Sequence, residues 1–236
     1  MILFFILLTA VIICGKYIHE LHNFNPTANL VNLQNPDSLN IQSLMKDKSP
    51  IIIHNLLGKH EDLLSVSLSN LIEKNPGYII NDNNKYLSLS SFNEKEVHQM
   101  FVINNQNMIQ DFHLNHSLDQ VLKPFQDQLS CNLTHKLSIL KGNQSLTLTQ
   151  NKRNFALFVQ FVGETTLYLF NPKHKEDITN KTNQEIKKWA IKIVLKPGII
   201  LYLPPEWYYI YETKDISILN ISECDSYFTW AYNSLR

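Results

Sequence analysis

Three side chains in the middle of the chain have a spacing that suits metal binding. His113, His116 and Asp119 follow one another at intervals of three residues, so a continuous helix would place them on one face. Imidazole and carboxylate groups bind several transition metals. The same residues also suit a solvated helix start capped by Asp111 or Asn115. Both interpretations stay open from the sequence.

An aromatic run near the C-terminus is the second candidate for chemistry. In a strand, Trp207, Tyr209 and Tyr211 would share one face, because successive side chains alternate. These rings could line a ligand pocket, or they could fill a hydrophobic core. No nucleophile elbow, phosphate-binding loop or dinucleotide fingerprint occurs anywhere in the chain.

The segments that must position these residues change character after Cys131. Before it, the pattern predicts a strand at 49–57, a helix at 60–74, a hairpin at 78–89 and a helix at 116–128. After it, short apolar segments alternate with turn residues. The predicted strands are 136–140, 145–149, 155–162, 165–170, 189–195, 199–203, 207–212, 216–221 and 227–232. This predicts a mainly β fold with a helical lead-in.

Composition excludes several classes of protein. The 236 residues carry 21 basic and 21 acidic side chains and no basic block, which argues against electrostatic nucleic-acid binding. A hydrophobic content of 44% excludes a wholly disordered chain. Cys14, Cys131 and Cys224 form no CxxC pair, so a zinc ribbon is excluded. Whether Cys131 and Cys224 form a disulfide stays open.

The N-terminus predicts a membrane attachment. Residues 1–14 are apolar and uncharged, and Lys16 could snorkel to extend the segment to residue 18. We therefore expect a single-pass signal-anchor at 1–18, with a possible secretory route and an undecided orientation. Residues 19–45 are expected to be a linker, and 46–236 one domain with an α/β lead-in (46–134) and a β-barrel (135–236).

One segment resembles a known family. Residues 195–212, LKPGIILYLPPEWYYIYE, resemble the last motif of the cupin-like, Jumonji-C-like branch of the 2-oxoglutarate oxygenases, in which Pro-Gly, an apolar pair, an aromatic residue and Pro-x-Gly-Trp-Trp-His follow in order. Weaker matches in the right order are 49–57, 138–149 and 160–172. The resemblance implies a double-stranded β-helix, a cupin or jelly-roll-like barrel. It also implies Fe(II) held by a His-x-Asp…His triad, and a lysine for the 2-oxoglutarate carboxylate.

The chain departs from the family at each of those positions. The metal-ligand positions fall on Gln150, Lys152 and Tyr209, and the cosubstrate lysine falls on Thr165. A primary amide is a poor iron ligand, an ammonium has no lone pair, and a phenol with a reference pKa near 10 ionises only at a cost. No histidine lies between 136 and 173 or after 174, so the distal ligand is missing under any local shift of the alignment.

The leading hypothesis is a membrane-tethered, catalytically inactive cupin-like domain for binding or scaffolding. No metal and no cofactor is expected, and the partner is an unidentified protein or small molecule. Trp207, Tyr211 and Tyr202 are candidates for a pocket at the barrel mouth. One alternative is a 2-oxoglutarate/Fe(II) hydroxylase whose atypical metal site uses Tyr209, Gln150 and a distant histidine. The other is a lumenal barrel that binds a small molecule or a glycan.

Overall fold

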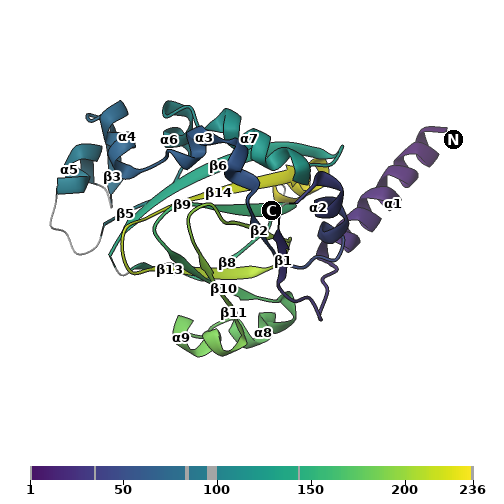
Figure 1. Ribbon diagram of the computed structural model, residues 1–236. Coiled ribbons are helices and arrows are strands. Elements are labelled where there is room, and N and C mark those ends of the chain that lie inside the picture. The colour runs from purple at the N-terminus through teal and green to yellow at the C-terminus, as the bar shows by residue number, and fades with distance from the viewer. Residues whose placement is uncertain (1, 35, 83–84, 95–99, 143, 235–236) are drawn as a thin grey trace.

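The computed structural model describes residues 2–34, 36–82, 85–94, 100–142 and 144–234. Its architecture is mixed α/β, with two large β-sheets and one separate hairpin among the described residues. Figure 1 shows helices on the outer side of each large sheet, so the domain has four layers. The concentration of strands after residue 131 is confirmed, but helices form a larger part of the fold than the sequence predicts.

The larger sheet has the strand order β1-β2-β12-β9-β14-β6-β5, in which only β1 and β2 are parallel. The other large sheet has the order β11-β10-β13-β7, and β8 also pairs with β13. The larger sheet contains β1 (Val31–Gln34), β2 (Ile51–His54), β5 (Met100–Asn105), β6 (Ser130–Lys141), β9 (Phe155–Val162), β12 (Ile200–Leu203) and β14 (Ser217–Ser226). The smaller sheet contains β7 (Gln144–Ser145), β8 (Thr149–Gln150), β10 (Thr165–Phe170), β11 (Ile191–Leu195) and β13 (Tyr208–Thr213), and the hairpin is β3 (Ile79–Asp82) with β4 (Lys85–Ser88).

The helices fall into an N-terminal, a lead-in, an insertion and a C-terminal group. The N-terminal and lead-in helices are α1 (Ile2–His22), α2 (Ser38–Met45), η1 (Leu56–Lys59), α3 (Glu61–Leu64), α4 (Leu68–Lys74), α5 (Leu89–Glu94), α6 (Gln106–Asp111), α7 (Asn115–Leu122) and η2 (Lys123–Phe125). The insertion between β10 and β11 contains η3 (Pro172–His174), α8 (Lys175–Ile178), α9 (Asn183–Ile186) and η4 (Lys187–Trp189), and α10 (Tyr227–Ser234) follows β14.

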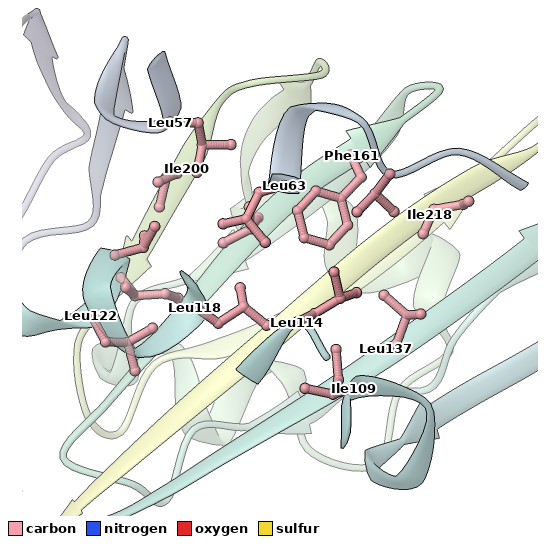
Figure 2. Close-up of a cluster of buried hydrophobic side chains, with 14 of the residues drawn as sticks. Leu57, Leu63, Ile109, Leu114, Leu118, Leu122, Leu137, Phe161, Ile200 and Ile218 are labelled. Atoms are coloured by element: carbon pink, nitrogen blue, oxygen red, sulfur yellow. The ribbon is translucent and has the colours of Figure 1, made fainter. Parts of the chain in front are cut away.

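Strand β9 shows why the layers form. Its sequence, FALFVQFV, is buried on both faces. Phe155 and Leu157 point toward the lead-in helices, whereas Ala156 and Phe158 point toward the smaller sheet. Figure 2 shows the helical side of this core, in which Leu118 and Leu122 of α7 belong to the same buried cluster as Ile200 and Ile218 of the sheet. A third cluster joins the outer face of β13 to α8 and α9.

The segment expected to be a linker contains regular structure. Strand β1 pairs in parallel with β2, and α2 begins at a cap in which Asp37 Oδ1 accepts a hydrogen bond from the Asn40 amide at 2.7 Å. Strand β6 begins at Ser130, before the expected start of the barrel at residue 135. The expected helix at 60–74 is divided into α3 and α4, because Ser67 is extended and caps α4.

The prediction of a strand at 227–232 is wrong, because these residues form α10. Two side chains cap this helix reciprocally. The Ser226 amide donates to Thr229 Oγ1 at 2.8 Å, and the Thr229 amide donates to Ser226 Oγ at 3.2 Å. These bonds satisfy amide groups that a helix N-terminus leaves without partners.

The prediction of a membrane-spanning signal-anchor at 1–18 is also wrong. Within the described residues, no helix combines the length and the apolar character that a membrane span requires. The reason lies in α1, where the uninterrupted apolar run ends at Cys14. Gly15, Lys16, His19, Glu20 and His22 then interrupt the apolar residues in the rest of the helix. An apolar stretch of that length rises about 20 Å, against about 30 Å for the hydrocarbon core of a bilayer.

Candidate functional site

A cleft of about 490 Å³ lies where β6, β8, β14 and α10 come together. We call it the mouth cleft. Its walls are formed by Lys136, Gln150, Lys152, Arg153, Glu223 and Asn233. Two of the positions that the resemblance assigns to iron ligands, Gln150 and Lys152, therefore lie in one cleft.

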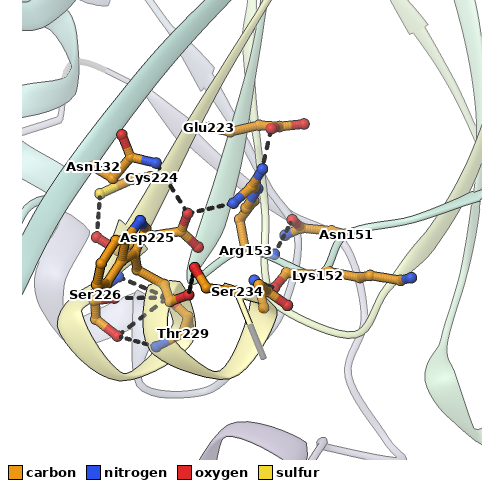
Figure 3. Close-up of polar contacts among 12 residues, drawn as sticks. Asn132, Asn151, Lys152, Arg153, Glu223, Cys224, Asp225, Ser226, Thr229 and Ser234 are labelled. Carbon is orange, nitrogen blue, oxygen red and sulfur yellow. Dashed lines mark hydrogen bonds and ion pairs between the residues drawn. The ribbon is translucent and has the colours of Figure 1, made fainter. Parts of the chain in front are cut away.

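Ion pairs join charged residues of the mouth cleft, and Figure 3 shows those that Arg153 makes with Glu223 and Asp225. Lys136 Nζ lies 2.7 Å from Glu223 Oε2, and Arg153 Nε lies 3.4 Å from the same oxygen. Arg153 Nη1 also contacts Asp225 Oδ2 at 2.5 Å, and the Asp225 side chain is only 1% exposed. Arg153 thus joins a partly buried carboxylate to an almost fully buried one.

Asn151 fixes the loop that carries Lys152 and Arg153. Its side-chain amide donates to the carbonyl groups of Leu203 and Pro204, at 3.1 and 2.9 Å. Its Oδ1 accepts from the Arg153 amide at 3.1 Å. Sequence reasoning passed over Asn151, because an asparagine between two altered ligand positions carries no pattern of its own. The buried amide ties the β8–β9 loop to the loop that precedes Trp207.

The three metal-ligand positions have different surroundings. Gln150 Nε2 donates to Glu206 Oε2 at 2.8 Å, and the other oxygen of Glu206 lies 3.2 Å from His22 Nδ1. The His22 imidazole therefore contacts Glu206 and not Gln150. Lys152 is exposed, and its ammonium group has no hydrogen bond or ion pair among the residues that the structure describes.

Tyr209 lies in the core between the two sheets. Its ring packs edge-to-face on Phe158, with centroids 5.0 Å apart, and it stacks on Tyr211. Burial, and after it the charge of Glu223, raise the pKa of the Tyr209 phenol well above its usual value. A phenolate ligand is therefore more costly here than in water.

These residues do not fit an Fe(II) centre of the facial-triad type. The amide of Gln150 is bonded to Glu206, Lys152 carries a cationic head, and the phenol of Tyr209 is held in its protonated form. Among the described residues, no group of three His, Cys, Asp or Glu side chains is placed to hold a metal ion.

Thr165, which the resemblance aligns with the cosubstrate lysine, is fully buried. Its Oγ1 lies 2.7 Å from Ser217 Oγ, which also accepts from Gln160 Nε2 at 2.8 Å. Along β10, Thr165 is four residues from Leu169, which pairs with Tyr209. That separation is about 13 Å along a strand. Thr165 is thus part of a buried hydroxyl and amide network away from the mouth cleft.

The three pocket candidates lie on two different faces. Trp207 is 0% exposed, and together with Tyr211 it belongs to the core between the sheets. Neither lines the mouth cleft. Tyr202 points to the opposite face of the larger sheet, where it packs on Phe125 and borders a separate cavity.

A hydrogen-bonded relay escaped sequence reasoning. His135 Nδ1 lies 2.7 Å from Ser222 Oγ, and His135 Nε2 lies 2.9 Å from Asp119 Oδ1. These residue types resemble a hydrolase triad, but Ser222 is 0% exposed, so its hydroxyl cannot reach a substrate. The sequence alone did not indicate this arrangement, because it depends on the register of β6 with β14, which pairs His135 with Ser222.

The structure does not place His113, His116 and Asp119 on one face of a continuous helix. Helix α6 ends at Asp111 and α7 begins at Asn115, so His113 lies between them, with a left-handed φ of 57°. Asp119 instead forms a hydrogen bond with His135.

Cys131 and Cys224 are free thiols, the first exposed and the second buried.

No protein family matches the chain, and neither does any curated protein.

Proposed function

We propose that this protein is a catalytically inactive cupin-like domain that works by binding. The observation that carries the proposal is the use of the metal-ligand positions for other purposes. Gln150 bonds Glu206, Tyr209 packs against Phe158, and Lys152 presents a free ammonium group in the mouth cleft. A site built in this way serves packing and charge. Its remaining oxygen atoms, in a neutral amide and a protonated phenol, are poor ligands for iron.

The strand order supports a cupin-like fold. Taken along the chain, β6, β8, β9, β10, β11, β12, β13 and β14 alternate between the sheets, except that β10 and β11 follow each other in the smaller sheet. They give the neighbours β6-β14-β9-β12 in one sheet and β8-β13-β10-β11 in the other. This is the order that a jelly roll of eight strands requires.

The backbone at Glu206 supports the same alignment. The family motif, Pro-x-Gly-Trp-Trp-His, has glycine immediately before its first tryptophan, and Glu206 occupies that place before Trp207. Glu206 has φ 68°, in the left-handed region that favours glycine. A left-handed residue at the glycine position of the motif supports the alignment, although the glycine itself is absent.

The charges of the mouth cleft favour an anionic ligand. Three cations, Lys136, Lys152 and Arg153, face two carboxylates, Glu223 and Asp225. Glu223 is paired with Lys136 and Arg153, and Asp225 is paired with Arg153. Lys152 is therefore left to attract a carboxylate or phosphate group. The ligand is therefore an anionic small molecule or an acidic side chain of a partner protein.

The metal test uses the full chain, purified without chelator and reloaded anaerobically with Fe(II). We expect no stoichiometric metal and no turnover of 2-oxoglutarate. The matched variant Gln150→His/Lys152→Asp/Tyr209→His restores the ligand set and is expected to bind one equivalent, provided that its tryptophan fluorescence shows a folded core. One tight equivalent in the wild-type chain would overturn the proposal.

The anion test titrates the chain with citrate in metal-free buffer and follows binding by calorimetry. Replacing Lys152 by methionine is expected to weaken binding about 2- to 5-fold, the effect of one partly exposed charge. Lys192→Met is the control, because Lys192 is an exposed lysine on β11 outside the mouth cleft. Equal weakening by both variants would show only a nonspecific effect of net charge.

A further inference from the structure

A second cavity, of about 320 Å³, lies between α1, α2, η2 and β12. We call it the Tyr202 cavity. It shares no lining residue with the mouth cleft. We propose that it binds a compact aromatic molecule with one carbonyl group, and that the Tyr202 hydroxyl anchors the ligand by donating a hydrogen bond to that carbonyl.

The walls of the Tyr202 cavity are held before any ligand arrives. Phe125 is 1% exposed, and its ring is stacked nearly parallel to Tyr202, with centroids 5.9 Å apart and an interplanar angle of 11°. Tyr17 of α1 is fixed on the other side, where its hydroxyl donates to Ser226 Oγ at 2.7 Å and its ring stacks on Phe228. A preformed wall reduces the entropy that binding would otherwise cost.

Tyr202 supplies the unsatisfied polar group. Its side chain is 2% exposed, and its hydroxyl has no hydrogen-bond partner among the described residues. The hydroxyl oxygen is open to the cavity that Tyr202 lines, so a ligand can reach it. Burial raises the pKa of this phenol well above its usual value, so it keeps its proton at neutral pH. A protonated hydroxyl in a cavity wall donates to an acceptor on the ligand.

Size and surface define the rest of the ligand. A volume of about 320 Å³ is near the lower end of the range for small-molecule sites, about 300–1,000 Å³. Phe125, Met45 and Pro205 offer apolar contacts, and aromatic rings suit the flat face of the Phe125 and Tyr202 pair. The rest of the lining is polar or charged and includes Lys46, Asp127 and Asn154. A single-ring ketone places its ring on the apolar part of the wall and its carbonyl at the Tyr202 hydroxyl.

The test compares acetophenone with ethylbenzene on the full chain by ligand-observed NMR. The two probes have nearly the same shape, but only acetophenone has a carbonyl. We expect saturable binding of both, with acetophenone tighter. Tyr202→Phe keeps the ring and removes the donor, so it is expected to weaken acetophenone about 3- to 10-fold and to leave ethylbenzene unchanged.

A second variant keeps the test decisive. Gln42 lies on the exposed side of α2 and lines the cavity, so Gln42→Trp is expected to block both probes without disturbing the core. Urea unfolding midpoints near that of the wild type confirm that both variants fold. The proposal is overturned if neither probe shows saturable binding, or if Tyr202→Phe leaves the preference for acetophenone intact. It is also overturned if Gln42→Trp binds both probes as the wild type does.

Discussion

Replacing Arg153 by methionine is expected to lower the free energy of unfolding by about 3–5 kcal/mol. Methionine keeps much of the aliphatic stem, so the loss comes from the guanidinium group. Without it, the almost fully buried Asp225 carboxylate retains only the Asn132 amide, at 3.4 Å, and its Oδ1 already has no hydrogen-bond partner. A buried charge without a counter-ion is among the costliest changes in a folded protein.

Two further variants separate this cause from a general loss of charge. Lys136→Met also removes a cation from the mouth cleft, but its partner Glu223 keeps Arg153 and is more exposed than Asp225, so we expect at most about 1 kcal/mol. Asp225→Asn in the Arg153→Met background should recover part of the loss, because the unpaired charge is gone. Urea unfolding followed by tryptophan fluorescence gives all four free energies. A smaller cost for Arg153→Met than for Lys136→Met would contradict the assigned role.

Local patterns predicted most of the strands after residue 131. Strand β9 is a run of aromatic and β-branched residues that ends at Gly163, which has φ 71° and leads into β10. The ideal Cβ position at Gly163 lies 2.0 Å from the Ile216 carbonyl oxygen, so a turn glycine is required there. Turn residues that end a strand can be recognised in a single sequence, because their effect depends on residues that are neighbours along the chain.

Features that depend on distant pairing were not predictable. Arg153 meets Asp225, and His135 meets Ser222, only because β14 lies between β6 and β9 with a particular register. The helix α10 was taken for a strand because its aromatic residues suit either structure, and only the Ser226–Thr229 cap decides. Gln150, Lys152 and Tyr209 were selected because a resemblance aligns them with metal ligands. The resemblance did not predict that Gln150 contacts Glu206 or that Tyr209 contacts Phe158.

Alkaline pH is expected to unfold this protein because several acids are buried in their protonated forms. Burial, together with the nearby carboxylates Asp225 and Asp127, raises the pKa of the Cys224 thiol to about 12. Burial likewise raises the pKa of Tyr211 to about 12, and it raises the pKa values of Tyr202 and Tyr209 further. The fold favours the protonated state of each of these groups.

The direction of the pH effect follows from linkage. A group whose pKa is higher in the folded than in the unfolded chain contributes stability that is complete below the unfolded value and is lost as pH rises toward the folded value. For Cys224 that window runs from about 8.5, the value of a free thiol, to about 12. At pH 10.5 the thiol alone removes about 2–3 kcal/mol from the free energy of unfolding, and the buried phenols add to the loss above pH 10.

Cys224→Ala isolates the contribution of the thiol. Alanine leaves a small cavity, so the variant starts from a lower stability, but the cavity does not titrate. Between pH 8.5 and 10 the free energy of unfolding should fall with a clear slope in the wild type and with a much smaller one in the variant. Urea titrations at half-unit intervals of pH measure both slopes. Parallel curves would mean that Cys224 ionises in the folded protein as easily as in the unfolded chain, and that water reaches the end of β14 beneath the mouth cleft.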